Sequence, residues 1–280
     1  PYIYDALLVD EGQDLDINAF NLFNKISKHI TVCMDYKQQI FDTGMTEQEI
    51  LAELNLRKSN ISLLEAYRCC PFISTLAAEL IDDKHEKQQY LNQVRVPQAE
   101  KEMPLIYIAK DYDDEIERLK SVLKIRLAKS EKIGIIILRN AMIDELKNRL
   151  RNEGFPVESG KDIDFTNGRI KIISYHSVKG LSFDTVLMPF LNEKSFTEKV
   201  PDIAFQKRLL FVAITRAVKW AYMSSTTGAE LKILERLKSL EHNKKLTVQR
   251  SGSLTSSNNN TLDKINLNGM SGINDNLDFL

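Results

Sequence analysis

An acidic pair follows a short apolar run near the start of the chain. We expect Leu7-Leu8-Val9 to form a buried strand that ends at Asp10, and Glu11 comes next. Parallel α/β sheets carry their reactive groups at the carboxyl ends of strands. One carboxylate there can hold Mg²⁺, usually through water, and a second can orient or deprotonate an attacking water. The pair suits a nucleotide hydrolase. A helix N-cap followed by a surface carboxylate would give the same sequence pattern.

Four further segments carry polar residues in a fixed order along the chain. Asp35 ends a second short strand and is followed by Gln38 and Phe41; the other three segments are residues 67–71, 174–184 and 208–217. Together with the Asp-Glu-Gly-Gln-Asp run at 10–14, they resemble motifs II to VI of the UvrD-like branch of superfamily 1 helicases. The resemblance spans about residues 3–225, and the ordered set is more specific than any single segment.

The resemblance implies an ATP-hydrolysing site with ATP and Mg²⁺ as cofactors. Asp10 would bind the metal ion, Glu11 would activate water, and Gln38 would sense the γ-phosphate and its water. Gln13 and Asp14 complete the motif and would link hydrolysis to the strand-binding surface.

Two arginines resemble the γ-phosphate arginines of the family, namely Arg68 and Arg216. A planar, permanently charged guanidinium suits a transition state whose negative charge is spread over three oxygens, and an arginine finger contributes roughly 10³–10⁵ in rate. Arg216 would come from a second domain, so ATP would close the cleft between domains. Alone, either arginine would most often be a surface charge or the partner of a carboxylate.

The fifth motif and Phe41 supply the candidate nucleic-acid contacts. Gly180 lets the backbone of the fifth-motif loop come close to a ligand, and the resemblance assigns Gly180 to nucleotide binding. His176 and Lys179 of the same loop would contact the nucleic-acid backbone. Phe41 falls where the family often has an aromatic residue that stacks on bases. For Phe41, core packing is an equally good interpretation.

The chain departs from the family pattern at several positions, of which two bear on the nucleotide site. It contains no G-x-x-x-x-G-K-[ST] loop; the nearest approach, from Gly154 to Gly160-Lys161-Asp162, is one residue too long and lacks the Ser or Thr. We therefore expect the phosphate-binding loop to lie upstream of Pro1. Ser182 stands where the family usually has a glutamate that binds ribose, which puts ribose recognition in doubt.

Apolar runs of strand length alternate with helical patterns, which predicts parallel sheets covered on both faces. The expected fold class is α/β, with RecA-like domains of the P-loop NTPase type, the first one incomplete. The expected strands lie at 6–9, 30–34, 61–64, 105–109, 133–138, 170–174, 184–189 and 219–224. The expected helices lie at 17–27, 46–54, after Pro71, and at 112–129, 141–152, 202–217 and 228–239.

A polar stretch near residues 82–104 is the best candidate for a domain boundary. We expect half of a first motor domain at 1–82, a linker at 83–104 and a second motor domain at 105–240. The remaining residues, 241–280, end in a Ser/Asn-rich run that predicts a flexible tail.

Composition limits the function classes only loosely. The 280 residues carry a formal net charge of −1, so a nucleic-acid partner must be met by local patches. Three cysteines give no disulfide framework, and no apolar run reaches the ~18 residues of a membrane span. These features predict a cytoplasmic protein without membrane contact. The expected partner is single-stranded or partly duplex DNA, with RNA and protein partners left open.

Three hypotheses follow. The first is a DNA helicase or single-strand translocase whose ATPase site is completed by upstream residues, so that the chain alone is inactive. The second is a nucleotide-gated, nucleic-acid-binding ATPase that does not unwind duplexes. The third is an inactive module for protein interaction. The chemically intact hydrolytic set argues against this third hypothesis; its members are Asp10, Glu11, Gln38, Arg68 and Arg216.

Overall fold

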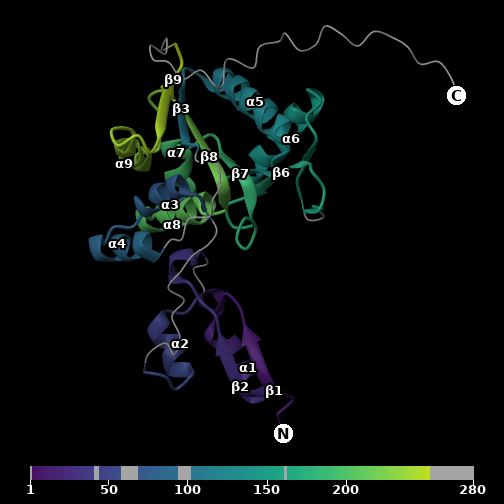
Figure 1. Ribbon diagram of the computed structural model, residues 1–280. Helices are drawn as coiled ribbons and strands as arrows, with labels where there is room; N and C mark the ends of the chain where they lie inside the picture. The colour runs from purple at the N-terminus through teal and green to yellow at the C-terminus, as the bar shows by residue number, and fades with distance from the viewer. Residues whose placement is uncertain (1, 41–43, 58–68, 94–101, 161–162, 253–280) are drawn as a thin grey trace, which may run out of the picture.

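The computed structural model describes residues 2–40, 44–57, 69–93, 102–160 and 163–252. Figure 1 shows two groups of elements along this chain. We call the described residues from 2 to 57 the small unit, and those from 69 to 252 the large unit. The expected strand at 61–64 lies outside the described residues.

The small unit is a two-stranded parallel sheet with two helices. β1 (Tyr4–Val9) and β2 (Ser27–Val32) pair in register from Tyr4 opposite Ser27 to Val9 opposite Val32. The helix between them, α1 (Ile17–Ile26), begins where Asp16 accepts a hydrogen bond from the Ala19 amide at 3.0 Å. α2 (Glu47–Glu53) begins with a capping box, because the Thr46 and Glu49 side chains each accept from the other's backbone amide.

β1 lies where the sequence predicts it, but it is not buried as predicted. The side chain of Leu8 is 80% exposed, and only Val9 of the strand is buried. Among the described residues β1 has one neighbouring strand, and the apolar cluster around Phe20, Met45 and Ile50 covers one face of the pair.

The large unit is built on a seven-stranded sheet in which every neighbouring pair is parallel. Its order is β5-β6-β4-β7-β8-β3-β9. The strands are β3 (Leu105–Ala109), β4 (Ile133–Ile137), β5 (Val157–Glu158), β6 (Ile170–Ser174), β7 (Phe183–Met188), β8 (Ala217–Thr226) and β9 (Thr247–Arg250).

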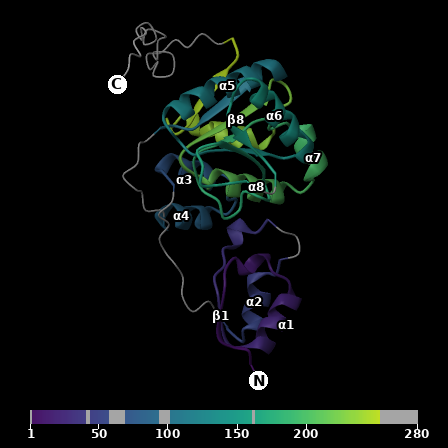
Figure 2. The same cartoon turned by 90° about the vertical axis from the view of Figure 1, so that its right-hand side faces the viewer.

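Helices cover both faces of this sheet, as Figures 1 and 2 show. α5 (Tyr112–Ala128) and α6 (Asn140–Asn152) supply the apolar side chains on one face. The helices whose side chains fill the core on the other face are α3 (Pro71–Ala78), α7 (Glu193–Lys199), α8 (Ile203–Ile214) and α9 (Ile233–Lys238). Both faces are therefore buried, and the predicted α/β class with a parallel sheet is confirmed.

Three elements lie where the sequence suggested linker, loop or tail. α4 (Lys84–Gln93) is a mostly polar helix that packs through Tyr90 on Phe211, with ring centroids 5.5 Å apart. The short α7 begins at the Asn192 cap. β9 adds to the sheet edge beside β3, where the Thr247 amide donates to the Pro104 carbonyl at 2.9 Å. A four-residue strand carries too little periodicity to be read from sequence.

α3 packs with the large unit, since Ile73, Leu76 and Ala77 share its core with strands β6 and β8. This packing favours a domain boundary before Cys69 rather than at 82, and we keep the division as a proposal. No helix in the described ranges is both long and apolar enough to cross a membrane.

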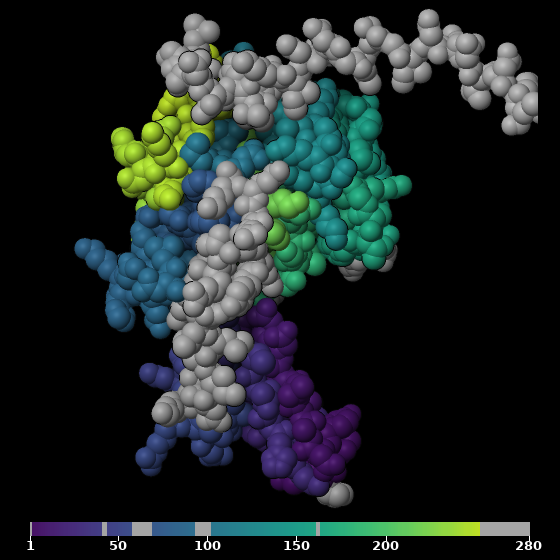
Figure 3. All heavy atoms as spheres, in the orientation of Figure 1, coloured from purple at the N-terminus to yellow at the C-terminus, as the bar shows by residue number. Residues whose placement is uncertain are grey.

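The two units meet over a small area between η2 (Tyr36–Gln38) and α8. Ile40 is 1% exposed and packs with the large core, and Lys37 forms an ion pair with Glu86 of α4 at 3.0 Å. In the space-filling view the small unit forms a separate lobe (Figure 3). Of the predicted site residues, Glu11, Gln38, Lys179 and Arg216 lie at this junction.

Candidate active site

The loop after β1 holds Glu11 in an unusual conformation. Glu11 has φ 53°, in the left-handed region that few side chains adopt, and opens the short 3₁₀ turn η1 (Gly12–Asp14). The Gly12 amide donates to the Cys33 carbonyl at 2.9 Å. A Cβ at Gly12 would lie 2.2 Å from Val32 Cγ1, so only glycine lets this loop rest against β2.

Gln13 connects this acidic loop to the segment after β2. Its side chain is fully buried, and its Nε2 donates to Glu11 Oε2 at 2.6 Å. Its Oε1 accepts from the Asp35 amide at 3.0 Å. Both polar ends of the amide are therefore used, which fixes the Glu11 carboxylate relative to Asp35.

Gln38 extends the same network to the large unit. Its Nε2 donates to Asp35 Oδ2 at 2.7 Å, and its Oε1 accepts from Arg216 Nη2 at 2.7 Å. Arg216 is 1% exposed and also donates from Nε to the Val212 carbonyl at 3.2 Å. A continuous chain of hydrogen bonds thus joins Glu11 to Arg216 through Gln13, Asp35 and Gln38.

Lys179 closes a second connection between the units. Its side chain is 8% exposed, and its Nζ lies 3.2 Å from Glu11 Oε2 and forms an ion pair with Asp14. Burial raises the pKa of Asp14, while the hydrogen bond and the charge of Lys179 lower it. Within the described residues, Asp14 Oδ1 is buried without a hydrogen-bond partner. A nucleic-acid contact by Lys179 stays a prediction, and it would require these ion pairs to break.

The other predicted residues lie at the margins of this network or beyond it. Asp10 is exposed, and its Oδ1 accepts from the Glu11 amide at 2.9 Å. Gly180 has φ 78° with open space where a Cβ would lie. His176 is exposed and outside the hydrogen-bonded chain, with its ring centroid 6.3 Å from that of Phe205. Arg68 and Phe41 lie outside the described residues.

The donor and acceptor groups of this network are of the chemical types that bind phosphate and a divalent cation. Mg²⁺ is usually held by one or two carboxylates together with water and phosphate oxygens, and Asp10 offers such an oxygen at the surface of the junction. In the part of the chain described by the structure, no group of three or more His, Cys, Asp or Glu residues forms a dedicated metal cage. Gln38 contributes an amide, Arg216 a guanidinium and Glu11 a carboxylate to the same hydrogen-bonded network. Ser182, which stands where the family usually has a glutamate, is exposed.

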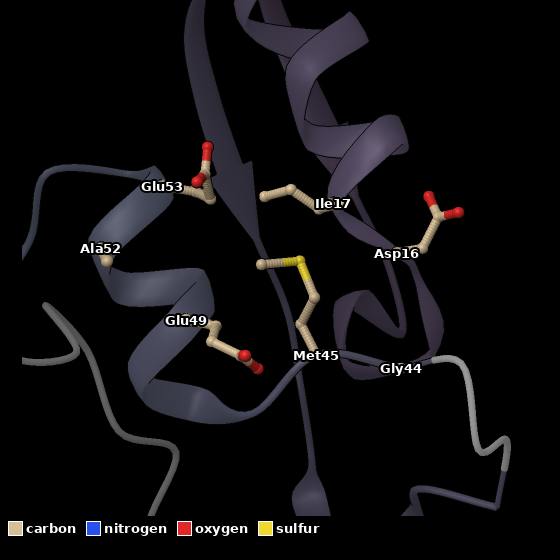
Figure 4. A pocket seen from close by; sticks show the side chains of 7 residues that line it. All are labelled: Asp16, Ile17, Gly44, Met45, Glu49, Ala52 and Glu53. Carbon is tan, nitrogen blue, oxygen red and sulfur yellow. The ribbon is translucent and has the colours of Figure 1, made fainter.

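A hollow in the small unit lies apart from the hydrogen-bonded network at the junction. It has a volume of about 500 Å³ and lies between α1 and α2, where Figure 4 shows its lining residues. The hydrogen bond from the Ala19 amide lowers the pKa of Asp16, and that from the Thr46 amide lowers the pKa of Glu49. With Glu53 these carboxylates make the hollow negative, so it would repel the phosphates of a nucleotide.

Comparison with known proteins bears on this geometry. Residues 158–228 match the family described as the UvrD-like helicase C-terminal domain. A protein of Acanthamoeba polyphaga mimivirus named "Putative ATP-dependent DNA helicase R568" is 24% identical over 235 residues, which cover 77% of this chain and 34% of that protein. The C-terminal domain of a possible DNA helicase from Lactobacillus plantarum WCFS1 is similar in structure, with a TM-score of 0.51, 15% identity and coverage of 65% of this chain and 98% of that one.

The matched segment contains both the fifth and the sixth motif, so the predicted resemblance to UvrD-like helicases is confirmed. The structural likeness, at 15% identity, bears on the fold alone and agrees with the parallel sheet. The chain spans about a third of the length of the mimivirus relative. The pairing of Lys179 with the acidic loop was not predicted, because it joins residues more than 160 positions apart.

Proposed function

We propose that this chain, with its segment of UvrD-like helicase C-terminal domain, is part of an ATP-driven DNA helicase or single-strand translocase. ATP would be hydrolysed at the junction of the two units, and hydrolysis would be coupled to movement along single-stranded DNA. The observation that supports this most is the hydrogen-bonded chain from Glu11 to Arg216, which brings side chains of three separate motifs together.

Each residue then has a definite task. Glu11 orients a water molecule and accepts its proton at a carboxylate oxygen, which requires Lys179 to release that oxygen. Gln38, already held by Asp35, presents its amide to the same water. Arg216 exchanges Gln38 for the terminal phosphate and neutralises the charge that develops there. ATP with Mg²⁺ near Asp10 supplies the phosphoryl group that is transferred to water.

The coupling follows from where the paired groups lie. Arg216 and Lys179 belong to the large unit, whereas Gln38, Glu11 and Asp14 belong to the small unit. A nucleotide that draws Arg216 and Gln38 onto its phosphate changes contacts on both sides of the junction, so the two units respond together.

The test is strand-stimulated ATP turnover and duplex unwinding by the longest natural protein that contains this sequence. Glu11→Gln should reduce turnover by roughly 10²–10⁴ and Arg216→Ala by roughly 10³–10⁵. Glu47→Gln, an exposed carboxylate of α2, is the matched control and should leave turnover unchanged. We expect the 280-residue chain alone to show no appreciable turnover, since it contains no phosphate-binding loop.

The outcomes separate the candidate functions. If Glu11→Gln leaves ATP turnover unchanged, Glu11 is not the residue that activates water. Turnover stimulated by single strands without any unwinding would favour a nucleotide-gated regulatory ATPase. No turnover in the longest protein would favour an interaction module.

A further inference from the structure

Three side chains meet at the start of α8, outside the hydrogen-bonded chain described above. The Phe205 ring lies 6.3 Å from the exposed imidazole of His176, centroid to centroid, with the planes tilted by 50°. The guanidinium carbon of Arg208 lies 5.4 Å from the centre of the same ring, within the range of a cation–π contact. Ile203, two residues before Phe205, is 60% exposed.

The charge of Arg208 is not used by any carboxylate in the described part of the chain. Arg208 forms no ion pair there, and its Nε is buried without a hydrogen-bond partner. The adjacent Lys207, by contrast, pairs with Asp82 at 2.7 Å. A half-buried guanidinium without a carboxylate partner is a favourable site for an anion, and it lies against an aromatic ring.

We propose that Phe205, Arg208 and His176 form a second contact site for single-stranded DNA, in which a base stacks at Phe205 and Arg208 binds a backbone phosphate. This inference rests on the proposed function; it adds Phe205, which lies outside the five motif segments, and gives Arg208 a role that the resemblance does not assign. Stacking on an aromatic side chain is tolerant of sequence, since every base has a π face. The site therefore suits a protein that moves along a strand.

α8 links this site to the nucleotide side of the junction. The helix carries Phe205 in its first turn and ends at Ile214, about 14 Å further at 1.5 Å per residue. Arg216 follows two residues later, and its Nη1 donates to the Leu181 carbonyl at 3.5 Å. The segment from His176 to Leu181 runs beside the same helix. A change at Arg216 is thus transmitted to both sides of the DNA site by rigid elements.

The experiment is fluorescence anisotropy of a labelled 20-residue oligothymidine with the 280-residue chain, measured across a range of salt concentrations. Phe205→Leu keeps apolar volume but removes the ring, and we expect it to bind roughly 5- to 100-fold more weakly. Arg208→Gln should reduce the slope of log affinity against log salt by about 0.7, the loss of one phosphate contact on a single strand. Phe165→Leu, an exposed aromatic residue between β5 and β6, is the matched control.

A strand that contains 2-aminopurine adds a direct readout of stacking. Its fluorescence should be quenched by the wild-type chain and by Phe165→Leu, but less by Phe205→Leu. If the wild type binds the strand and Phe205→Leu binds equally well with equal quenching, the second site is refuted while the proposed function stands. If the wild type binds no single strand at all, the second site is refuted, and turnover by the longest natural protein decides the proposed function separately. Thermal unfolding of each variant confirms that it is folded.

Discussion

Lys179 holds two acidic residues of the small unit from a loop of the large unit. The side chains of Lys179 and Asp14 are only 8% and 14% exposed, so this ion pair is screened far less than a surface pair. Glu11, which we assign as the hydrolytic base, shares the same ammonium group. In this arrangement the Glu11 carboxylate is paired with Lys179, so the hydrolysis that we propose would require Lys179 to release it.

At the residue scale we predict that Lys179→Met lowers the free energy of unfolding by about 1–2 kcal/mol at neutral pH, less than for a fully buried pair. Burial raises the pKa of Asp14 and Lys179 opposes that rise, so removing Lys179 raises it further. An ionised Asp14 without its partner destabilises the fold. The loss should therefore be largest above this raised pKa and shrink as the pH falls through it and Asp14 takes up a proton.

Urea unfolding of the chain at several pH values measures this effect. Lys124→Met, an exposed lysine of α5, is the control and should change stability little at any pH. A loss of stability that is independent of pH would argue against the ion pair with Asp14 as its source.

At the scale of elements, the loop after β1 depends on close approach to β2. Gly12 lies so near Val32 that a methyl group would overlap its Cγ1, and the loop cannot move away without losing the hydrogen bond to the Cys33 carbonyl. This contact sets the direction in which Glu11 points.

We predict that Gly12→Ala destabilises the chain by about 1–3 kcal/mol, the usual cost of inserting a methyl group into a packed site. Hydrogen exchange should become faster at the amides of β2, and Glu11-dependent turnover should fall in the longest natural protein. Gly168→Ala is the matched control, because nothing lies within 4 Å of the added Cβ. Equal stability of the two variants would contradict the packing described for Gly12.

Some elements could be predicted from sequence and others could not, for identifiable reasons. The strands from β3 to β8 other than β5 are apolar runs buried on both faces, and the caps at Asp16 and Thr46 are local signals. β5 and β9 have only two and four residues, and they depend on hydrogen bonds to a neighbouring strand for their existence. α4 carries few apolar residues and is positioned mainly by the packing of Tyr90.

At the scale of the whole molecule, polar contacts account for much of the docking of the two units. Among the described residues, the junction includes Ile40, the Gln38–Arg216 hydrogen bond and the ion pairs of Lys179 and Lys37. Polar contacts of this kind are reversible, which suits a junction that opens and closes in each cycle.

We predict that energy transfer between the units decreases as salt rises from about 50 to 500 mM, because ion pairs at the junction are screened. One dye can be placed on Cys33, the exposed cysteine of the small unit, and the other on α7 as Thr197→Cys, since Cys69 and Cys70 are buried. Combining Lys179→Met with Arg216→Ala should lower the transfer already at low salt, whereas Lys124→Met should not. Transfer that is insensitive to both salt and these substitutions would contradict polar contacts as the source of the docking.

The sequence by itself determined the class of the fold and the set of chemical groups. Apolar runs of strand length and apolar residues at helical spacing are local properties of the sequence. The order of the short motifs along the chain is likewise a property of the sequence alone. Only the tertiary structure decided which of those groups touch. Glu11 reaches Arg216 through Gln13, Asp35 and Gln38, and Lys179 turns toward the acidic loop rather than toward solvent. Such pairings join residues up to 178 positions apart, and they depend on how two units dock, which no local pattern encodes.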